Sequence, residues 1–386
     1  MNSTYTQPLT LLNNLTATEF LTEYWQKKPL LIRQAIPNFA GLLDANELAG
    51  LACEEDVQAR IIQCKHGQWS VKQRPFAERD FAKLPQGKSK KSDWTLLVQG
   101  VNHLLPEAAD LLAQFNFIPT ARLDDLMVSY APDGGGVGPH LDSYDVFLLQ
   151  GSGKRHWKIS TQSDVSLIED APIRILKHFE TEQEWVLEAG DMLYLPPQVA
   201  HWGTAVGEDC MTYSIGFRAP KTQELAHEFL SYLQDNLALN GIYQDPDLAL
   251  QNNPADISMQ MVNKVSEMLQ NITWDQNLVG HFLGQYLTEP KPHIVFEAVD
   301  DISLNTFAKH LSKQTLYLSL PSQMLCWQGT FYLNGERMEV PESCLACMQK
   351  LANQRFINGS DFDATTMKQL ATLLLPHYLA GYLNFE

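Results

Sequence analysis

Two short motifs, far apart in the chain, carry side chains able to bind one metal ion. His140 and Asp142 form a His-x-Asp pair at the start of an expected strand, directly after the glycine-rich segment 131–139. Residues two apart on a strand point to the same face, so both side chains are expected to reach one ion. His201 ends the second motif, 190–201, where an expected strand stops at a proline turn. Two imidazoles and one carboxylate form the facial triad that binds iron(II) and leaves coordination positions open.

The two motifs differ in how strongly they indicate a metal site. A lone His-x-Asp pair is more often a capping pair or a core pair than a set of ligands. The spacing of glycine, proline and histidine from Gly190 to His201 is more specific. Together, in this order and within a run of short strands, the motifs predict an open metal centre. The alternative is a barrel whose site is vestigial or purely structural.

The region that must position these side chains reads as a series of short strands broken by glycine and proline. The expected strands are 126–130, 146–150, 155–159, 185–187, 192–195 and 211–217. The turn Gly151–Gly153 joins two of them as a hairpin. Many short strands at regular spacing predict a sandwich or a barrel.

The chain after this region has a different pattern. Apolar residues recur at helical spacing between 225 and 286, which predicts amphipathic helices. Long amphipathic helices beside a completed β-domain commonly pack on a second subunit, so we expect a homodimer interface here. After Pro290 a small domain is expected, with a hairpin at Asn334-Gly335 and helices near 342–353 and 365–375.

The composition limits the classes of partner. The 386 residues contain 28 Lys and Arg against 45 Asp and Glu, a formal net charge of −17. Such a surface repels phosphate backbones and attracts basic partners, although many cytosolic enzymes are also acidic. We therefore expect a basic peptide or protein partner and no direct nucleic-acid binding. The N-terminal residues MNSTYTQPLT lack a signal-peptide pattern and no apolar stretch could span a bilayer, so a cytoplasmic protein without membrane contact is expected.

Three segments resemble the bacterial ribosomal oxygenases of the JmjC/cupin superfamily: YWQKKPLLIR, LDDLMVSYAPDGGGVGPHLDSYDVFLLQGSGKRHWKI and GDMLYLPPQVAHWG. The likeness is close from about residue 17 to 220. It implies an α+β fold built on a double-stranded β-helix (cupin/JmjC) barrel with a winged-helix-like domain at the C-terminus. The expected ranges are 1–90 for an N-terminal α/β elaboration, 91–220 for the catalytic barrel, 221–289 for a helical dimerisation region and 290–386 for the winged-helix-like domain.

The resemblance also implies an activity, namely protein hydroxylation with iron(II), 2-oxoglutarate and dioxygen (O2). The expected target is the β-carbon of an arginine in ribosomal protein L-sixteen of the large subunit, so the partner is a basic ribosomal protein. Animal relatives hydroxylate histidines of other ribosomal proteins, and a histidine target stays open. A sugar-phosphate or sugar-binding cupin is a further alternative, but it leaves Arg155 without a purpose. A DNA-binding regulator is opposed by the charge of −17 and by the lack of a basic stretch in 340–386.

The resemblance and the residue chemistry assign roles around the metal. His140, Asp142 and His201 are the expected iron ligands, and no catalytic residue is expected beyond the metal centre. Arg155 suits the distal carboxylate of 2-oxoglutarate, because a guanidinium can grip a carboxylate with two hydrogen bonds. The neighbouring Lys154 is expected to point to the opposite face. By resemblance, Ser129 donates a hydrogen bond to the same carboxylate.

The substrate side of the pocket is harder to assign. A basic target side chain needs an acidic partner, and the available acids are Asp124, Asp125, Asp133 and Asp145. We favour Asp124, on the strand that leads to Ser129, and expect Ser214 to line the same pocket. The run Gly134–Gly136 is not followed by a lysine or a helix start, so we interpret it as a flexible lid and not as a phosphate loop.

Overall fold

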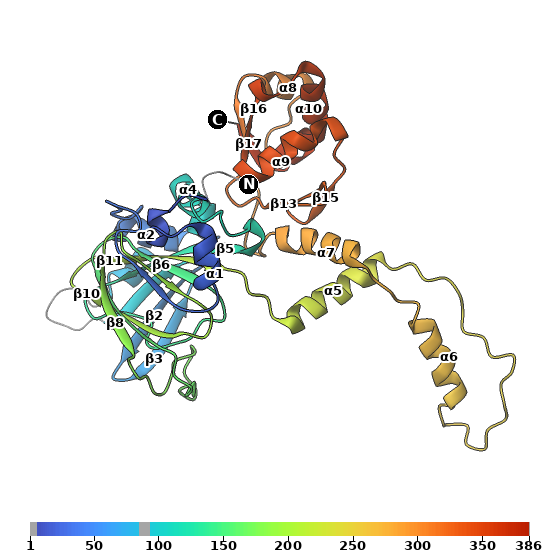
Figure 1. Cartoon of the computed structure of the whole chain (residues 1–386), viewed down its shortest axis with the longest axis horizontal. Helices are drawn as coiled ribbons and strands as arrows, with labels where there is room; N and C mark the ends of the chain where they lie inside the picture. Colours follow the sequence, from blue (N-terminus) through green and yellow to red (C-terminus); the bar gives the residue numbers. More distant parts are fainter. Residues whose placement is uncertain (1–5, 85–92, 386) are drawn as a thin grey trace.

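The computed structural model describes residues 6–84 and 93–385, which form a β-rich body, a helical arm and a C-terminal domain (Figure 1). The domain boundary expected between residues 90 and 91 lies outside the described residues, and the other expected limits stay predictions. Within the described part of the chain, no helix is both long and apolar enough to cross a bilayer.

The N-terminal segment supplies helices and strands that extend the barrel. Thr16 caps α1 (Ala17–Glu23) by accepting a hydrogen bond from the backbone N–H of Glu19, and Asp44 caps α2 (Ala45–Cys53) in the same way. The other elements of this segment are η2 (Thr10–Leu12), β1 (Leu30–Ile32), β2 (Ala59–Lys65), β3 (Gln68–Gln73), α3 (Glu78–Phe81), β4 (Trp94–Val98), η3 (Val101–His103), α4 (Pro106–Ala113) and η4 (Thr120–Arg122).

Two antiparallel sheets make the barrel. Its strands are β5 (Leu123–Ala131), β6 (Val146–Gln150), β7 (Lys154–Ser160), β8 (Gln183–Glu188), β9 (Met192–Leu195), β10 (Ala200–Val206) and β11 (Cys210–Phe217). The larger sheet has eight strands in the order β1-β9-β6-β11-β5-β4-β2-β3, and the smaller has three in the order β10-β7-β8. The N-terminal strands therefore widen the larger sheet at both of its edges.

The hydrophobic core lies on both faces of the larger sheet. On the outer face the ring of Phe20 in α1 meets the rings of Tyr194 and Phe147, with centroids 5.0 and 5.5 Å apart. All three rings are fully buried, and such pairs stabilise the fold beyond the area that they bury. A smaller cluster between the sheets includes Leu148, Trp157, Leu187 and Leu193. Much of the remaining space between the sheets is a cavity lined partly by polar side chains.

The helical arm, residues 222–274, extends away from the β-rich body in Figure 1. It contains α5 (Thr222–Asn236) and α6 (Met259–Leu269), joined by residues 237–258 without helix or strand. No residue of α6 is buried. Large apolar side chains are exposed along the arm: Leu230, Leu239, Ile242, Leu248, Leu250, Ile257, Met259, Met261, Val262, Met268, Leu269 and Trp274.

The C-terminal domain combines helices with two small sheets. Its elements are α7 (Gln276–Thr288), α8 (Leu304–Leu311), β12 (Thr315–Leu318), β13 (Met324–Trp327), β14 (Thr330–Leu333), β15 (Glu336–Met338), η5 (Glu342–Cys344), α9 (Leu345–Gln354), β16 (Phe356–Asn358), η6 (Gly359–Asp361), α10 (Ala364–Leu379) and β17 (Leu383–Phe385). The sheets have the orders β16-β12-β17 and β13-β14-β15. A Cβ atom on Gly280 of α7 would lie 2.2 Å from the indole of Trp327, so only glycine lets this helix approach the β13–β14 hairpin.

The sequence predicted most of these elements. Each expected barrel strand coincides with or lies within a strand of the structure, and the middle helices are confirmed in type and place. Asn334 and Gly335 both have positive φ, as a tight hairpin turn requires, and they join β14 to β15. The expected helix 365–375 is longer in the structure and continues through Pro376 to Leu379.

Candidate metal centre and its cavity

The structure brings His140, Asp142 and His201 together. His140 lies between β5 and β6, and its backbone N–H donates to the carbonyl of His201 at 3.0 Å, with the reciprocal bond at 2.9 Å. The two imidazole centroids are 4.2 Å apart, and Asp142 Oδ2 lies 3.6 Å from His201 Nε2. One ligand atom from each of the three residues lies within 4.8 Å of the other two. The three side chains therefore converge on one point.

The local backbone around His140 differs from the expectation. The strand expected at 140–142 is reduced to one isolated bridge at His140, and the Asp142 carbonyl accepts a bond from the N–H of Gln198. The run Gly134–Gly136, interpreted from the sequence as a flexible lid, is hydrogen-bonded to β10, since the N–H of Gly134 donates to the carbonyl of Ala205 at 3.0 Å. A Cβ on Gly136 would lie 2.3 Å from the carbonyl oxygen of Gly203, so the glycines allow this loop to lie directly against β10.

Hydrogen bonds to the backbone fix the orientation and the tautomer of the two imidazoles. The Nδ1–H of His140 donates to the carbonyl of Gly138 at 2.9 Å, and that of His201 donates to the carbonyl of Val199 at 3.0 Å. A carbonyl can only accept, so each Nδ1 carries the proton and each Nε2 lone pair is available to a metal. Burial, and next the neighbouring His140, lower the pKa of His201 to about 4. This imidazole is therefore neutral at neutral pH, as metal binding requires.

The three side chains open onto a cavity of about 510 Å³ between the two sheets. Alternate residues of β5, namely Asp125, Met127 and Ser129, line it from the larger sheet. Arg155 and Trp157 of β7 line it from the smaller sheet. The other lining residues include Arg60, Leu97, Gln99, Asp124, Tyr144, Leu148, Ile173, Arg174, Thr212 and Ser214.

Arg155 is a buried cation with no anionic partner in 6–84 or 93–385. Its side chain is 3% exposed, and its Nε and Nη2 have no hydrogen-bond partner among the described residues. The Ser129 hydroxyl makes only a 3.5 Å contact with the carbonyl of Thr212. Lys154 is exposed and ion-paired with Glu188 on the outer face, as expected. An unpaired buried guanidinium is costly, so this end of the cavity fits a carboxylate.

The donor set and the unpaired cation together fit iron(II) and 2-oxoglutarate. Two imidazoles and a carboxylate are the ligands of non-haem iron sites with open positions. A dicarboxylate could occupy those positions with one end and reach Arg155 and Ser129 with the other. The cavity is large enough for a small molecule and part of a substrate side chain.

The acids near the cavity have different surroundings. Asp124 lines the cavity but is ion-paired, with its Oδ1 2.9 Å from Lys291 Nζ and 3.6 Å from Arg218 Nε. Asp125 is more deeply buried and shares the inward face of β5 with Ser129. It accepts a hydrogen bond from the N–H of Gly100, and its Oδ2 lies 3.9 Å from Lys291 Nζ. Burial raises the pKa of Asp125, and Lys291 opposes that shift.

Some cavity residues were not singled out from the sequence. Asp125 lines the cavity beside the favoured Asp124, and its spacing from Ser129 on one strand is the sequence signal for its inward position. Tyr144 and Arg60 also line the cavity, and neither stands in a motif. Asp133 accepts a bond from the N–H of Gly207 in a turn, and Asp145 is fully buried against Tyr194 and Gln26, so both have structural partners.

Two family models match the chain. A JmjC domain model matches residues 110–225, and a ROXA-like winged helix model matches residues 269–384. The second match begins before α7, which agrees with the packing of that helix against the β13–β14 hairpin.

Curated proteins and solved structures match almost the whole chain. The ribosomal protein uL16 3-hydroxylase of Escherichia coli (strain K12) is 32% identical over 372 residues, 95% of this chain and 97% of the relative. A probable ribosomal oxygenase of Haemophilus influenzae is 35% identical over 316 residues, 81% of this chain and 72% of the relative. The structure of the E. coli ribosomal oxygenase YcfD with cobalt and 2-oxoglutarate has a TM-score of 0.81 at 30% identity, covering 96% of this chain and 98% of that one.

Proposed function

Because this chain belongs to the JmjC ribosomal oxygenase family, we propose that it is an iron(II)- and 2-oxoglutarate-dependent hydroxylase of uL16, the bacterial L-sixteen protein. The target that we propose is the β-carbon of an arginine. One observation carries the proposal: an open set of three metal ligands and an unpaired buried guanidinium share a single cavity.

His140, Asp142 and His201 would hold the iron, and Arg155 and Ser129 would hold the distal carboxylate of 2-oxoglutarate. When bound, iron supplies the oxidation: one atom of O2 enters the substrate C–H bond, and the other enters succinate as 2-oxoglutarate loses carbon dioxide. The protein contributes ligand orientation through the two Nδ1–H bonds and a neutral His201. It also supplies a partly enclosed cavity with apolar walls that limits the access of water.

The strand β5 runs along the cavity from the proposed cosubstrate end, at Ser129, to the proposed substrate end, at Asp125. From Ser129 to Asp125 the strand advances four residues, which is about 13 Å at the usual rise. We place the positive side chain of the target at Asp125, with Asp124 at the rim and Ser214 beside them. Met127 and Ser214 are register partners on β5 and β11, so they lie between the two ends. An acidic wall favours a permanently charged arginine over a neutral histidine.

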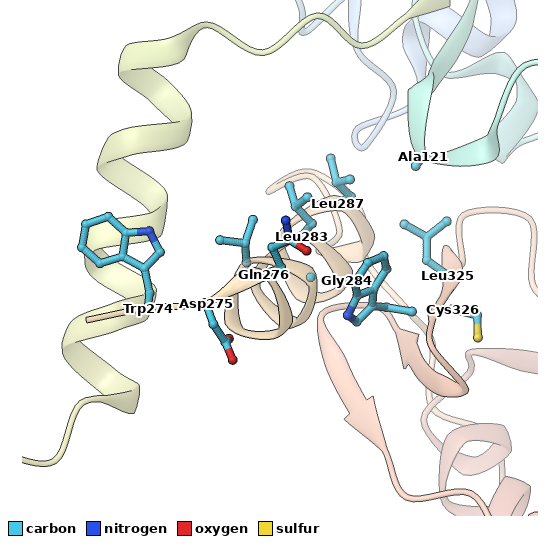
Figure 2. Close-up of a pocket in the computed structure, with 12 residues that line it drawn as sticks. Ala121, Trp274, Asp275, Gln276, Leu283, Gly284, Leu287, Leu325 and Cys326 are labelled. Carbon is cyan, nitrogen blue, oxygen red and sulfur yellow. The ribbon is translucent and has the colours of Figure 1, made fainter. Parts of the chain in front are cut away.

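The apolar arm supports a homodimer. Its exposed side chains form a set too large to leave in water, and Leu250 is fully exposed. Figure 2 shows Leu283 and Leu287 of α7 near Leu325 of β13, with Trp274 beside the long helix of the arm. These residues line a cavity of about 650 Å³. The ring centroids of Trp274 and Phe229 of α5 are 5.5 Å apart. We propose that a second copy covers this apolar surface, and that the enzyme meets its substrate in the cytoplasm.

The substrate class can be tested by comparing targets of increasing size. Free arginine, a uL16 peptide of about 20 residues and whole uL16 would each be incubated with the enzyme, iron(II) and 2-oxoglutarate. We expect the protein and peptide to be hydroxylated far faster than free arginine. At substrate concentrations below KM, rates should fall with added salt, because the enzyme carries −17 and the target is basic. Equal rates on all three, without salt dependence, would indicate a small-molecule oxygenase.

A further inference from the structure

Arg60 reaches the cavity from a strand outside the seven that make the barrel. It lies on β2 and pairs with Leu97 of β4, which pairs with Ser129 of β5, which pairs with Thr212 of β11. Residues in register across neighbouring strands point to the same face of a sheet. All four of these residues line the cavity. Arg60 is therefore an inward-facing residue of the larger sheet.

The side chain of Arg60 is only partly used by the fold. Its Nε is buried and has no hydrogen-bond partner, and its guanidinium makes no ion pair with any residue in 6–84 or 93–385. A buried donor without a hydrogen-bond acceptor destabilises the protein. We therefore expect a group from another molecule to accept a hydrogen bond from Arg60 Nε. Among the arginines that line the cavity, Arg155 shows the same deficit and Arg174 is exposed.

The cosubstrate does not account for Arg60. Both ends of 2-oxoglutarate already have partners, one at the metal and the other at Arg155 and Ser129. Arg60 lies two strands away from Ser129 within the sheet, a lateral distance of about 10 Å between backbones. The acceptor for Arg60 must therefore belong to the other molecule that enters the cavity, which is the protein substrate.

The walls near Arg60 indicate which part of the substrate it meets. Beside Arg60 the cavity is lined by Ile62, two residues along β2, and by its register partner Leu97, and Tyr144 is near enough to feel the Arg60 charge. The apolar residues Val137, Ile173 and Ile175 line the same cavity. A basic substrate offers few carboxylates, and its cationic side chains are repelled by a guanidinium. Every peptide unit, in contrast, offers a neutral carbonyl oxygen. We infer that Arg60 donates to a main-chain carbonyl of the substrate segment that carries the hydroxylated residue, while Ile62 and Ile173 contact a neighbouring apolar side chain. This inference rests on the proposed function.

Arg60→Met tests the inference because the two effects of the substitution change KM for the peptide in opposite directions. Loss of a positive charge should lower this KM, and loss of a hydrogen bond to the substrate should raise it. Removing any cation from an acidic enzyme strengthens its long-range attraction for a basic peptide. The matched control is Arg79→Met, which removes the same charge at an exposed position of α3 that does not line the cavity. We expect Arg60→Met to raise KM for a uL16 peptide about tenfold. The control should leave that KM unchanged or slightly lower, and KM for 2-oxoglutarate should be unchanged in both.

Three results would overturn the inference. A higher KM for 2-oxoglutarate would place the cosubstrate at Arg60, an unchanged peptide KM would mean that there is no contact, and a lower one would mean that Arg60 only repels the substrate. Arg60→Lys is the second variant in case the methionine variant is unstable, and it should recover only part of the peptide affinity. If the wild-type enzyme hydroxylates no arginine of uL16, the proposed function fails instead, and the two failures are thereby distinguished.

A set of modified peptides identifies the carbonyl. Replacing one amide by an ester weakens the carbonyl as an acceptor, and such peptides can cover the positions beside the target residue. At one position the ester should raise KM with the wild-type enzyme but have little further effect with Arg60→Met, because the same bond is removed twice. Additive losses at every position would contradict a bond from Arg60 to the main chain.

Discussion

The barrel cavity and the helical arm both leave side chains without partners, but the side chains are of opposite chemical kinds. Among the described residues that line the cavity, the unpaired groups are buried polar atoms: Nε of Arg60, Nε and Nη2 of Arg155 and Nε1 of Trp157. In the arm they are apolar and exposed, with Leu250 fully exposed and Ile242 at 77%.

This difference indicates what completes each region. A buried polar group is satisfied by a small molecule or ion that enters the cavity and brings acceptors or an empty coordination site. Exposed apolar groups are satisfied only by another apolar surface, which for a chain of this kind means a second macromolecule. The proposed chemistry and the proposed assembly therefore depend on different parts of one chain, and substitutions should separate them.

The largest effect is expected from the metal ligands. His140→Ala and His201→Ala should each lower 2-oxoglutarate turnover by about a thousandfold or more, because losing the ion removes the oxidation itself. Asp142→Ala should also lose activity, with residual iron binding on the two imidazoles. His156→Ala is the control, since that histidine pairs with Glu184 on the same sheet without lining the cavity. Near-normal turnover in either ligand variant would exclude this triad.

Arg155→Met should have the next largest effect, on cosubstrate affinity. Losing a charge-assisted pair in a closed site costs roughly 2–5 kcal/mol, which raises KM for 2-oxoglutarate about thirty- to several-thousand-fold. KM for the peptide should change far less. Steady-state kinetics would be compared with Lys154→Met, which removes the adjacent exposed cation. Equal cosubstrate constants in the two variants would mean that the carboxylate is held elsewhere.

In the arm, a charge should disrupt assembly and leave the chemistry intact. Leu269→Asp places a carboxylate in the exposed apolar surface of α6 and should weaken the dimer by about 2 kcal/mol, or about thirtyfold in dissociation constant. Sedimentation would measure the dimer, and Gln270→Asp is the adjacent polar control. Turnover of 2-oxoglutarate without protein substrate should not change. A wild-type protein that sediments as a monomer would contradict the proposal that the arm forms a dimer interface.

The smallest effect concerns the junction between the barrel and the C-terminal domain. Burial, then Lys291 and Arg355, lower the pKa of His103 to about 4 from its ordinary value of 6.5. Between these values the unfolded chain binds a proton that the folded chain does not. Stability from this group is therefore complete above about pH 6.5 and is lost as the pH falls toward 4. His103→Asn should flatten the fall of Tm in this range, and the exposed His227→Asn should not. Parallel plots of Tm against pH for the wild type, His103→Asn and His227→Asn would contradict this role of His103.

The clustering of His140, Asp142 and His201 could be predicted from sequence because each of them lies in a local motif. A His-x-Asp pair and a proline-turn histidine are recognisable within a few residues, and their order matched the order of the strands. The barrel strands were predictable for the same reason, since glycine and proline mark their ends. The strand β10 was not predicted, because the proline turn before it is a stronger local signal than the pattern of its own residues.

The rest of the site depends on contacts between distant segments. Arg60 reaches the cavity only because β2 joins the larger sheet beside β4, and nothing in its own segment indicates that neighbour. Counting alternate residues from Ser129 places Asp125 on the inward face of β5, and Asp124 lines the same cavity from the next position. The ion pairs that engage Asp124 come from Arg218 and Lys291, far along the chain, and no local pattern predicts them. The close packing of Gly134–Gly136 against β10 could not be predicted, because close backbone packing and flexibility both select glycine.

The most direct measurement is the mass spectrum of uL16 after incubation with the enzyme, iron(II), 2-oxoglutarate and O2, with His140→Ala as the parallel control. The expected result is the mass of one oxygen atom added to a single arginine, with fragment ions placing it at the β-carbon. Succinate should form in equal amount, and the control should show neither product. Oxygen on a histidine of another ribosomal protein would correct the target. An unmodified uL16, or equal modification by the control, would contradict the proposed hydroxylase and its metal centre.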